Sequence, residues 1–180
     1  MSPEGPCKDK ELAEGVARND HACVATFFGA YHAGVFRFML CLTGNRHDAE
    51  DLAQDSLLRA KSKIKSFRGD AALKTWIHQV AYHTYTHWNR SRRRHEPLPL
   101  QVAGKDRSFT AVDDGQTLLA ALVKLGPAYA HPFVLQEVSG HTVEEIARIL
   151  DIPEGTVKSR LHTARQRMRA LLGPEENYHA

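Results

Sequence analysis

Residues His141 to Met168 read HTVEEIARILDIPEGTVKSRLHTARQRM and predict two short helices joined by a tight turn. Thr142 and Glu145 form the S/T-x-x-E pattern of a capping box, whose side chains satisfy exposed backbone donors at a helix start. Pro153 lacks the amide proton that a helix interior needs and fits a first turn, so the second helix is expected to begin there. This is the layout of a helix-turn-helix unit, which binds DNA.

The second of these helices is predicted to have one apolar and one polar face. Its apolar residues recur at steps of four, three and four positions and make a buried stripe of Val157, Leu161, Ala164 and Met168. The opposite face carries Gly155, Lys158, Ser159, His162, Arg165, Gln166 and Arg169. Such a helix enters the major groove of DNA with its N-terminal residues first. An amphipathic hairpin with a solvated basic face would show the same pattern, so these residues alone leave both interpretations open.

Composition limits the class of protein. A length of 180 residues allows one large domain or two small ones, and 42% hydrophobic residues suffice for packed cores. No apolar run approaches the ~20 residues that span a membrane, and the first residues lack the apolar stretch of a secretory signal. Cys7, Cys23 and Cys41 cannot all pair with one another and show no metal-ligand spacing, which favours a reducing cytoplasm. Cys23 and Cys41 are interpreted as core residues.

Charge is distributed unevenly along the chain, although the formal net charge is only +3. Asp48 to Ser56, DAEDLAQDS, holds four carboxylates and no cation, whereas Arg90 to Arg94, RSRRR, holds four arginines. The segment from Glu154 to Ala170 adds five cations against one acid. One acidic surface followed by two basic ones predicts a protein partner for the first and nucleic acid for the others. Any one of these runs taken alone is also typical of a solvated face.

The whole chain is predicted to be all-α, because no alternating strand pattern occurs. In the first half, the apolar spacing predicts helices over Lys10–Arg18, over His21–Leu42, from Asp48 to Phe67 and over Ala72–Arg92. Asp48, Asp51 and Asp55 fall outside the apolar stripe of the third helix, so its acidic face is expected to be exposed.

The fourth of these helices has two distinct faces. Its apolar stripe consists of Leu73, Ile77, Val80 and Trp88. The other side presents Gln79, Tyr82, His83, Thr86 and Arg90. An aromatic ring and a histidine among hydrogen-bond donors and a cation suit stacking on bases and contact with phosphates.

A linker is predicted between two halves of the chain. His95 to Gln116 contains prolines and glycines and has no helical period. We therefore expect two small helical domains at 1–94 and 117–180, joined by a flexible linker at 95–116. In the second domain a helix is expected near Thr117–Val138, with a break at Gly126-Pro127 and a new start or a kink near Pro132.

Taken together, these segments resemble the bacterial RNA polymerase sigma factors of the extracytoplasmic-function (ECF, group IV) type, which contain only sigma domains 2 and 4. The resemblance extends from about Glu11 to Leu172. Its strongest parts are DAEDLAQDSLLRA, FRGDAALKTW, RSRRR and VEEIARILDIPEGTVKSRLHTAR. A helix-turn-helix by itself occurs in many repressors and response regulators. Its position downstream of the other three motifs makes the resemblance specific.

The resemblance implies an alternative sigma factor that binds core RNA polymerase, through the β′ clamp and β flap regions, and directs it to promoter DNA. The residues that match the family's β′-docking helix are Asp48, Glu50, Asp51, Gln54 and Asp55. Those that match its minus-ten loop and helix are Arg68, Gly69, Asp70, Ala71, Lys74, Gln79, Tyr82, His83, Thr86, Arg90, Arg92 and Arg93. In the family the loop captures a base flipped out of the minus-ten element, and the helix reads and melts that element.

The helix that reads the minus-thirty-five element is matched by Glu154, Gly155, Thr156, Lys158, Ser159, Arg160, His162 and Arg165. The resemblance also implies an anti-sigma factor as a partner. The cysteines and the lack of a long apolar run separately predict a cytoplasmic location and no insertion into a membrane. The resemblance implies no catalytic residues, no cofactor and no metal site, because the polymerase performs the chemistry.

The chain departs from the family pattern at three positions. Lys61 stands where family members often carry an aromatic residue, and His83 and His87 replace the asparagine and aspartate often found in the minus-ten helix. His83 and His87 share one helical face with His78 nearby, so a metal site is conceivable. Histidines on a DNA-facing surface are the simpler interpretation.

Two other classes of protein remain to be compared. A DNA-binding regulator that never contacts polymerase would explain Thr142–Arg169 but would leave the acidic helix and the long linker without a role. An enzyme would need a Gly-rich phosphate loop, a nucleophile with its base or a zinc-ligand set, and none of these is evident in the sequence. The sequence therefore favours the sigma factor.

Overall fold

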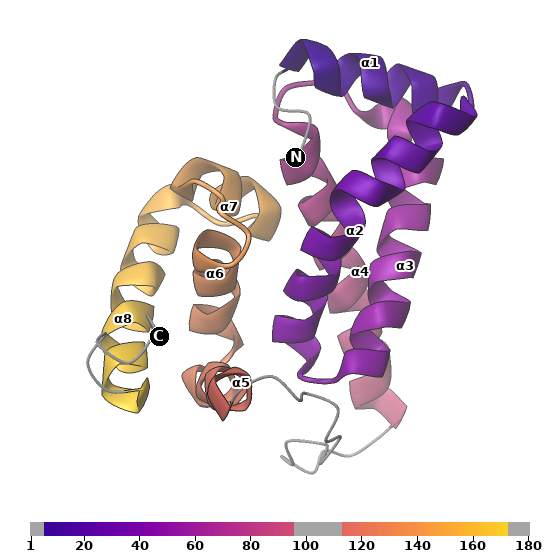
Figure 1. Ribbon diagram of the computed structural model, residues 1–180. Helices are drawn as coiled ribbons and strands as arrows, with labels where there is room; N and C mark the ends of the chain where they lie inside the picture. The colour runs from indigo at the N-terminus through magenta and orange to yellow at the C-terminus, as the bar shows by residue number, and fades with distance from the viewer. Residues whose placement is uncertain (1–5, 96–112, 173–180) are drawn as a thin grey trace.

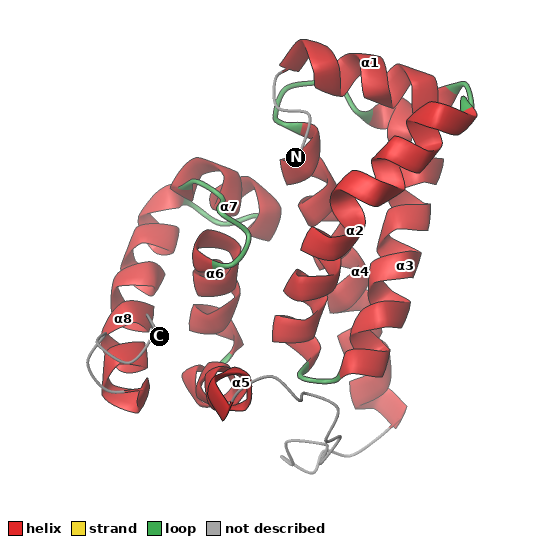
Figure 2. Cartoon of the chain, viewed as in Figure 1, coloured by secondary structure: helices red, strands yellow, loops and turns green. Residues whose placement is uncertain are grey.

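The computed structural model describes residues 6–95 and 113–172, and every regular element in these two ranges is helical (Figure 2). The first half contains α1 (Pro6–Ala17), α2 (His21–Thr43), α3 (Arg46–Ser62), the short 3-10 helix η1 (Ile64–Ser66) and α4 (Leu73–His95). The second half contains α5 (Asp113–Leu125), α6 (Pro127–Glu137), α7 (Val143–Leu150) and α8 (Glu154–Leu172). The predicted all-α fold class is thereby confirmed.

In the first half, α2, α3 and α4 lie side by side, and α1 lies across one end of them (Figure 1). Their shared core is apolar and fully shielded from water at Phe27, Val35, Phe38, Leu57 and Ile77. Burying a side chain of this size contributes about 1.5–3 kcal/mol each, so the three long helices are held by their apolar stripes. Cys23 and Cys41 are half-buried against this core, in keeping with their predicted place.

Local capping explains where these helices begin and end. The Asp20 side chain accepts a hydrogen bond from the backbone N–H of Cys23 at the start of α2. Gly44 ends α2 in the left-handed conformation, with φ of 66°. Asn45 then caps α3 by accepting from the N–H of Asp48. The start of α4 is capped by a residue far away in sequence, because the Asp9 carboxylate of α1 accepts from the N–H of Leu73 at 2.8 Å.

The sequence misplaces two features of the first half. The helix predicted to run from Asp48 to Phe67 ends at Ser62, since the chain tightens into i→i+3 hydrogen bonds in η1. Phe67 instead leaves the helix and packs against Trp76, with ring centroids 5.7 Å apart. Helix α1 begins at Pro6, before the predicted Lys10.

Helix α2 corrects the expectation that no segment approaches the length of a membrane span. It has 23 residues, and by length and composition alone it is apolar enough to cross a bilayer, with a mean hydropathy of 1.3 in its most apolar window. Its outward side nevertheless carries the exposed polar residues Thr26, His32 and Arg37. One apolar face packed on α3 and α4 and one polar face are typical of a core helix.

The helices of the second half begin and end largely where the capping and helix-breaking residues predict. Gly126 separates α5 from α6 at φ of 80°, so the predicted break is confirmed. Helix α6 continues through Pro132 without a new start there. The capping box at the start of α7 is formed, with Thr142 and Glu145 each accepting from the other's backbone N–H. Asp151 takes the left-handed conformation between α7 and α8, with φ of 54°.

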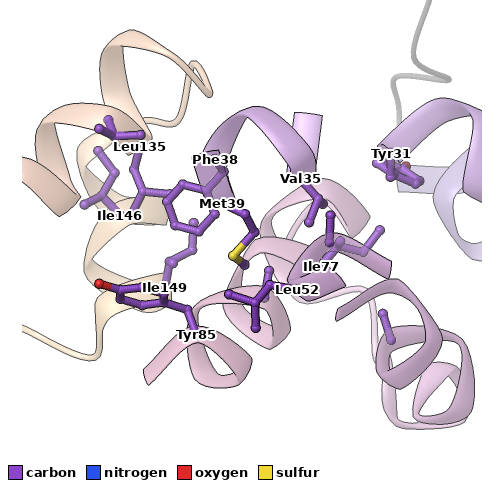
Figure 3. Packing of buried hydrophobic residues seen from close by; sticks show 14 of the residues in the cluster. Tyr31, Val35, Phe38, Met39, Leu52, Ile77, Tyr85, Leu135, Ile146 and Ile149 are labelled. Carbon is purple, nitrogen blue, oxygen red and sulfur yellow. The ribbon is translucent and has the colours of Figure 1, made fainter. Parts of the chain in front are cut away.

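The two halves pack against each other instead of standing apart. Helix α7 lies on α4 and helix α6 contacts α2, and we call this packing the closed arrangement. Leu135, Ile146 and Ile149 of the second half join the same buried cluster as Phe38 and Tyr85 of the first (Figure 3). The segment between the helices is shorter than the predicted linker at 95–116, because His95 belongs to α4 and α5 already begins at Asp113. Residues 96–112 of that linker lie outside the described ranges.

Candidate nucleic-acid interface

The acidic residues proposed for docking lie along one side of α3. The side chains of Asp51 and Gln54 are exposed, and those of Asp48, Glu50 and Asp55 are half-buried. Arginines one turn away partly balance them: Arg46 pairs with Glu50 at 3.2 Å and Arg59 with Asp55 at 2.8 Å. The imidazole of His47 lies 3.6 Å from Asp51. The acidic face is therefore present as predicted, with cations at its margin that lie just outside the acidic run in sequence.

Asp48 joins the two proposed surfaces of the first half. Its carboxylate accepts a hydrogen bond from Arg92 Nη1 of α4 at 2.8 Å. Arg92 also stacks over the Trp88 ring, with its guanidinium carbon 5.1 Å from the ring centroid. The proposed docking residue Asp48 thus holds one of the arginines assigned to the minus-ten element. Arg93, also assigned to the minus-ten element, is not among the residues whose side chains the structure describes.

The loop between η1 and α4 borders a cavity of about 430 Å³. The first half contributes Ser66, Phe67, Arg68, Gly69, Asp70, Ala71, Thr75, Trp76 and Gln79 to its walls, and the second half contributes Arg148 and Asp151. Gly69 has φ of 80°, a conformation that side chains disfavour, and a Cβ there would also collide with Lys10. Arg68 and Asp70 are exposed.

The outward face of α4 is divided between solvent and the second half. His83 and Arg90 are exposed, whereas Lys74 and Thr86 are half-buried. Gln79 Nε2 donates to the carbonyl of Arg148 at 3.3 Å, and the Tyr82 hydroxyl lies 3.3 Å from Nδ1 of His131 in α6. Gln79 and Tyr82, which the sequence places on the DNA-facing side, therefore contact the second half in the closed arrangement.

Helix α7 supplies the polar contacts to this face. Thr75 of α4 donates from its hydroxyl to Oε1 of Glu145 at 2.5 Å, and Arg148 donates to the backbone carbonyl of Asp70 at 2.9 Å. Burial raises the pKa of Glu145, but the hydrogen bonds from Thr75 and from the N–H of Thr142 outweigh it and leave the pKa below its ordinary value. A carboxylate that stays ionised is thus held between the halves.

Two buried histidines, His78 and His141, and the half-buried His131 lie where the halves meet. The rings of His78 and His141 are in edge-to-face contact with centroids 4.6 Å apart, and His131 contacts Tyr82 and Tyr85. Burial is the main cause that lowers the pKa of His78 to about 3, and it also lowers the pKa of His131 and His141 to about 4. All three rings are neutral at physiological pH.

The structure does not assemble the metal site considered for the minus-ten helix. His78 is buried against His141, whereas His83 and His87 are exposed on α4. Among the side chains that the structure describes, no group of three or more potential metal ligands occurs.

Helix α8 presents the proposed minus-thirty-five residues on an open surface. Glu154, Gly155, Lys158, Ser159, His162 and Arg165 are exposed, and Thr156 and Arg160 are half-buried. Two of the cations already have partners, since Lys158 lies 3.7 Å from Glu154 and Arg165 donates to Gln136 and Glu137 of α6. The predicted stripe of Val157, Leu161, Ala164 and Met168 is buried beneath this surface.

Sequence reasoning missed the residues that join the halves. Glu145 was recognised only as a capping residue, and Thr75, His131, His141 and Arg148 were not singled out for any contact. One signal was present in the sequence: Thr75, His78, Gln79 and Tyr82 share a face of α4 at helical spacing.

Comparison with known protein families covers both halves. The sequence model described as Sigma-70 region 2 matches residues 27–95, and that described as Sigma-70, region 4 matches residues 115–168. The unmatched segment between them, 96–114, falls within the predicted linker.

Individual relatives match over nearly the full length. The ECF RNA polymerase sigma factor SigM of Mycobacterium tuberculosis is 30% identical over 166 residues, which cover 92% of this chain and 85% of SigM. SigW of Bacillus subtilis, also an ECF RNA polymerase sigma factor, is 26% identical, with 91% of this chain and 96% of SigW covered. The sigma factor RpoE of Bartonella quintana, solved with its anti-sigma factor NepR, superposes with a TM-score of 0.72 at 27% identity, covering 82% of this chain and 95% of RpoE.

Proposed function

The chain belongs to the ECF RNA polymerase sigma factors, and we propose that its two helical halves divide promoter recognition between them. Like other members it is a transcription initiation factor that directs RNA polymerase to promoters and catalyses no reaction of its own. We assign residues 1–94 to sigma domain 2, 95–116 to the linker and 117–180 to sigma domain 4. The observation that carries this division is the pair of separate charged surfaces, acidic on α3 and basic on α8.

The acidic side of α3 is proposed to dock on the β′ clamp of core polymerase. Asp51 and Gln54 are exposed there, with Glu50 and Asp55 beside them. The neighbouring Leu58 keeps 58% of its surface exposed, which is unusual for a leucine. An apolar side chain at the end of an acidic row supports a protein partner, because interfaces combine an apolar centre with a charged rim. The second half is proposed to contact the β flap.

The cavity beside Arg68–Ala71 is proposed to receive a base flipped from the minus-ten element. Taking a base out of the stack costs a few kcal/mol, so a preformed cavity next to cationic groups favours strand opening. In the closed arrangement Arg148 is bonded to the Asp70 carbonyl at the edge of this cavity.

The exposed side of α8 is proposed to read the minus-thirty-five element. Lys158, Ser159 and His162 lie at the N-terminal and central turns, the part of a recognition helix that meets base edges. A good bidentate base contact contributes roughly 1–3 kcal/mol of discrimination. Cations on phosphates add affinity that is independent of sequence and falls with salt.

An anti-sigma factor is proposed as a further partner. RpoE, which this chain resembles over most of its length, was solved in complex with one. ECF sigma factors are soluble transcription factors, and we propose that this one acts in the cytoplasm, where polymerase and promoter DNA are found.

The proposed function is tested by run-off transcription on fragmented genomic DNA, with core polymerase from the same organism, in the presence and absence of the purified chain. New discrete transcripts are expected only when the chain is added. The double variant Asp51→Ala/Asp55→Ala is expected to lose them together with co-elution with core. Glu14→Ala, which removes an exposed carboxylate from α1, should keep both. A chain that binds promoter DNA but never co-elutes with core would instead be a polymerase-independent regulator.

A further inference from the structure

His78 and His141 meet at the centre of the contact between the halves. His78 belongs to α4, and His141 precedes α7. Both residues are almost fully buried, with 2% and 3% of their surfaces exposed. The two rings are in edge-to-face contact, and Phe38 of α2 packs on the other side of His78 with centroids 5.4 Å apart.

The hydrogen bonds of the two rings define their protonation state. Nδ1 of His78 lies 2.9 Å from the carbonyl oxygen of Lys74, so it must carry the proton and donate. Nδ1 of His141 lies 3.5 Å from Oε2 of Glu145 and faces an acceptor in the same way. The other nitrogen, Nε2, is therefore unprotonated in both rings and carries a lone pair. Both Nε2 atoms are buried without a hydrogen-bond partner.

The surroundings do not support a positive charge on either ring. From α4, Lys74 opposes protonation of both rings, and the nearby His141 also opposes protonation of His78. From α7, Glu145 favours it, but this carboxylate is already bonded to Thr75 and to the N–H of Thr142. Phe38 on α2 offers no charge. Proton binding at Nε2 would place a cation in a buried position with no acceptor, which is strongly unfavourable.

We propose that His78 and His141 make the closed arrangement sensitive to pH: as neutral rings they hold the two halves together, and protonation of either ring drives the halves apart. Separation exposes both rings to water, where an imidazolium is hydrated. The sign follows from linkage. Both rings have a pKa below the ordinary 6.5 in the closed arrangement, so the closed form binds fewer protons than the open form. Closure is favoured above about pH 6.5 and is lost as the pH falls toward about 4.

The size of the effect depends on how many rings titrate. Each ring shifts the ratio of open to closed molecules by up to about tenfold per pH unit over this window. Two rings acting together give up to about a hundredfold per pH unit. A modest acidification is therefore enough to change which arrangement dominates, if the two are within a few kcal/mol of each other.

The test measures the separation of the halves directly and uses neither polymerase nor DNA, so its outcome is independent of the proposed function. The radius of gyration of the full chain is measured by small-angle X-ray scattering at about pH 7.5 and about pH 5, on either side of the ordinary histidine pKa. The wild type is expected to expand at the lower pH while its far-UV circular dichroism keeps the full helical signal. The double variant His78→Phe/His141→Phe, which retains two flat rings that cannot be protonated, should expand less than the wild type, because only His131 still titrates in the contact between the halves.

The matched control is His32→Phe, which removes an exposed histidine of α2, and it should expand like the wild type. If the double variant does not fold, NMR titration of the wild-type imidazole signals replaces it. The chemical shifts of His78 and His141 are then expected to keep the values of neutral rings until the radius of gyration rises. They should change over the same pH range as the radius. A wild-type radius that is the same at both pH values, or a double variant that expands as the wild type does, would contradict the proposal.

Discussion

The hydroxyl of Thr75 in α4 donates to Glu145 Oε1 in α7 at 2.5 Å, which connects the proposed minus-ten helix to the first helix of the helix-turn-helix. The other oxygen of the same carboxylate accepts from the N–H of Thr142 at 2.9 Å and completes the capping box. Glu145 therefore stabilises the start of α7 and the contact between the halves with one side chain. A substitution at Glu145 affects both, whereas a substitution at Thr75 affects only the contact.

The bond between Thr75 and Glu145 can be isolated in a double-mutant cycle. Thr75→Val keeps the shape of the side chain and removes the donor, and Glu145→Gln removes the charge. A hydrogen bond to a charged group contributes about 1.5–3 kcal/mol, so we expect a coupling of roughly 1–2 kcal/mol in the free energy of unfolding measured in urea. Thr84→Val is the matched control, because the Thr84 hydroxyl bonds within α4 to Val80. Its effect should add to that of Glu145→Gln within about 0.5 kcal/mol. Equal coupling in both pairs would show that the bond contributes nothing.

Two glycines at α2 should respond to alanine in opposite ways. Gly44 ends the helix at φ of 66°, where a side chain costs about 1–2 kcal/mol. Gly44→Ala is therefore expected to lower the melting temperature. Gly29 lies within α2, and a Cβ there would meet nothing within 4 Å. Gly29→Ala should raise the stability by up to about 1 kcal/mol, since alanine favours the helix. Thermal denaturation followed by circular dichroism distinguishes the two, and a shift of the same sign would contradict the capping role of Gly44.

Lys158 should contribute to DNA binding through phosphate charge. It is exposed on α8 and lies 3.7 Å from Glu154. Lys158→Ala is expected to weaken binding to a minus-thirty-five duplex and to reduce by about one the slope of log affinity against log salt. Fluorescence anisotropy at several salt concentrations measures that slope. The control Lys124→Ala removes an exposed lysine from α5 that is not among the proposed minus-thirty-five residues, and it should leave the slope unchanged. An unchanged slope in Lys158→Ala would remove this residue from the interface.

The three histidines at the contact between the halves should make the whole fold less stable in mild acid. His78, His131 and His141 have a lowered pKa in the folded chain and the ordinary value of about 6.5 when unfolded. The unfolded chain thus binds more protons, and the free energy of unfolding falls as the pH drops from about 6.5 toward about 4, by up to about 1.4 kcal/mol per pH unit for each ring. Urea denaturation at about pH 7.5 and about pH 5 measures the loss. His131→Phe should reduce it, whereas His32→Phe should not. Equal stability of the wild type at both values would contradict the burial of neutral rings.

The helices were predictable where local chemistry decides them. The capping box of Thr142 and Glu145 and the turn at Gly126-Pro127 depend on residues within a few positions of each other, and both occur as the sequence predicts. The end of α3 was not predictable in the same way. Apolar spacing continues through Ile64 and Phe67, but Phe67 reaches Trp76 only by leaving the helix. Its position depends on a partner in α4 and not on its own segment.

The candidate site was only partly predictable for the same reason. The charges of α3 and α8 are visible in the sequence as runs, and both lie on accessible surfaces of the structure. The role of Gln79 and Tyr82 in the closed arrangement was not visible, because a polar face suited to DNA is equally suited to a polar partner in the same chain. The cap that Asp9 provides for Leu73 likewise joins residues far apart in sequence.

The buried cluster that continues from one half into the other limits how such proteins can be recombined. A chimera that fused one half of this chain to the complementary half of a relative would treat the two halves as interchangeable modules. In this chain Phe38 and Tyr85 of the first half are buried in the same cluster as Leu135, Ile146 and Ile149 of the second (Figure 3). A graft that replaces one set without the other leaves an apolar area without its counterpart. Exchange of promoter specificity by transplantation should therefore be confined to the outer side of α8, leaving the inner surfaces of both halves with their native neighbours.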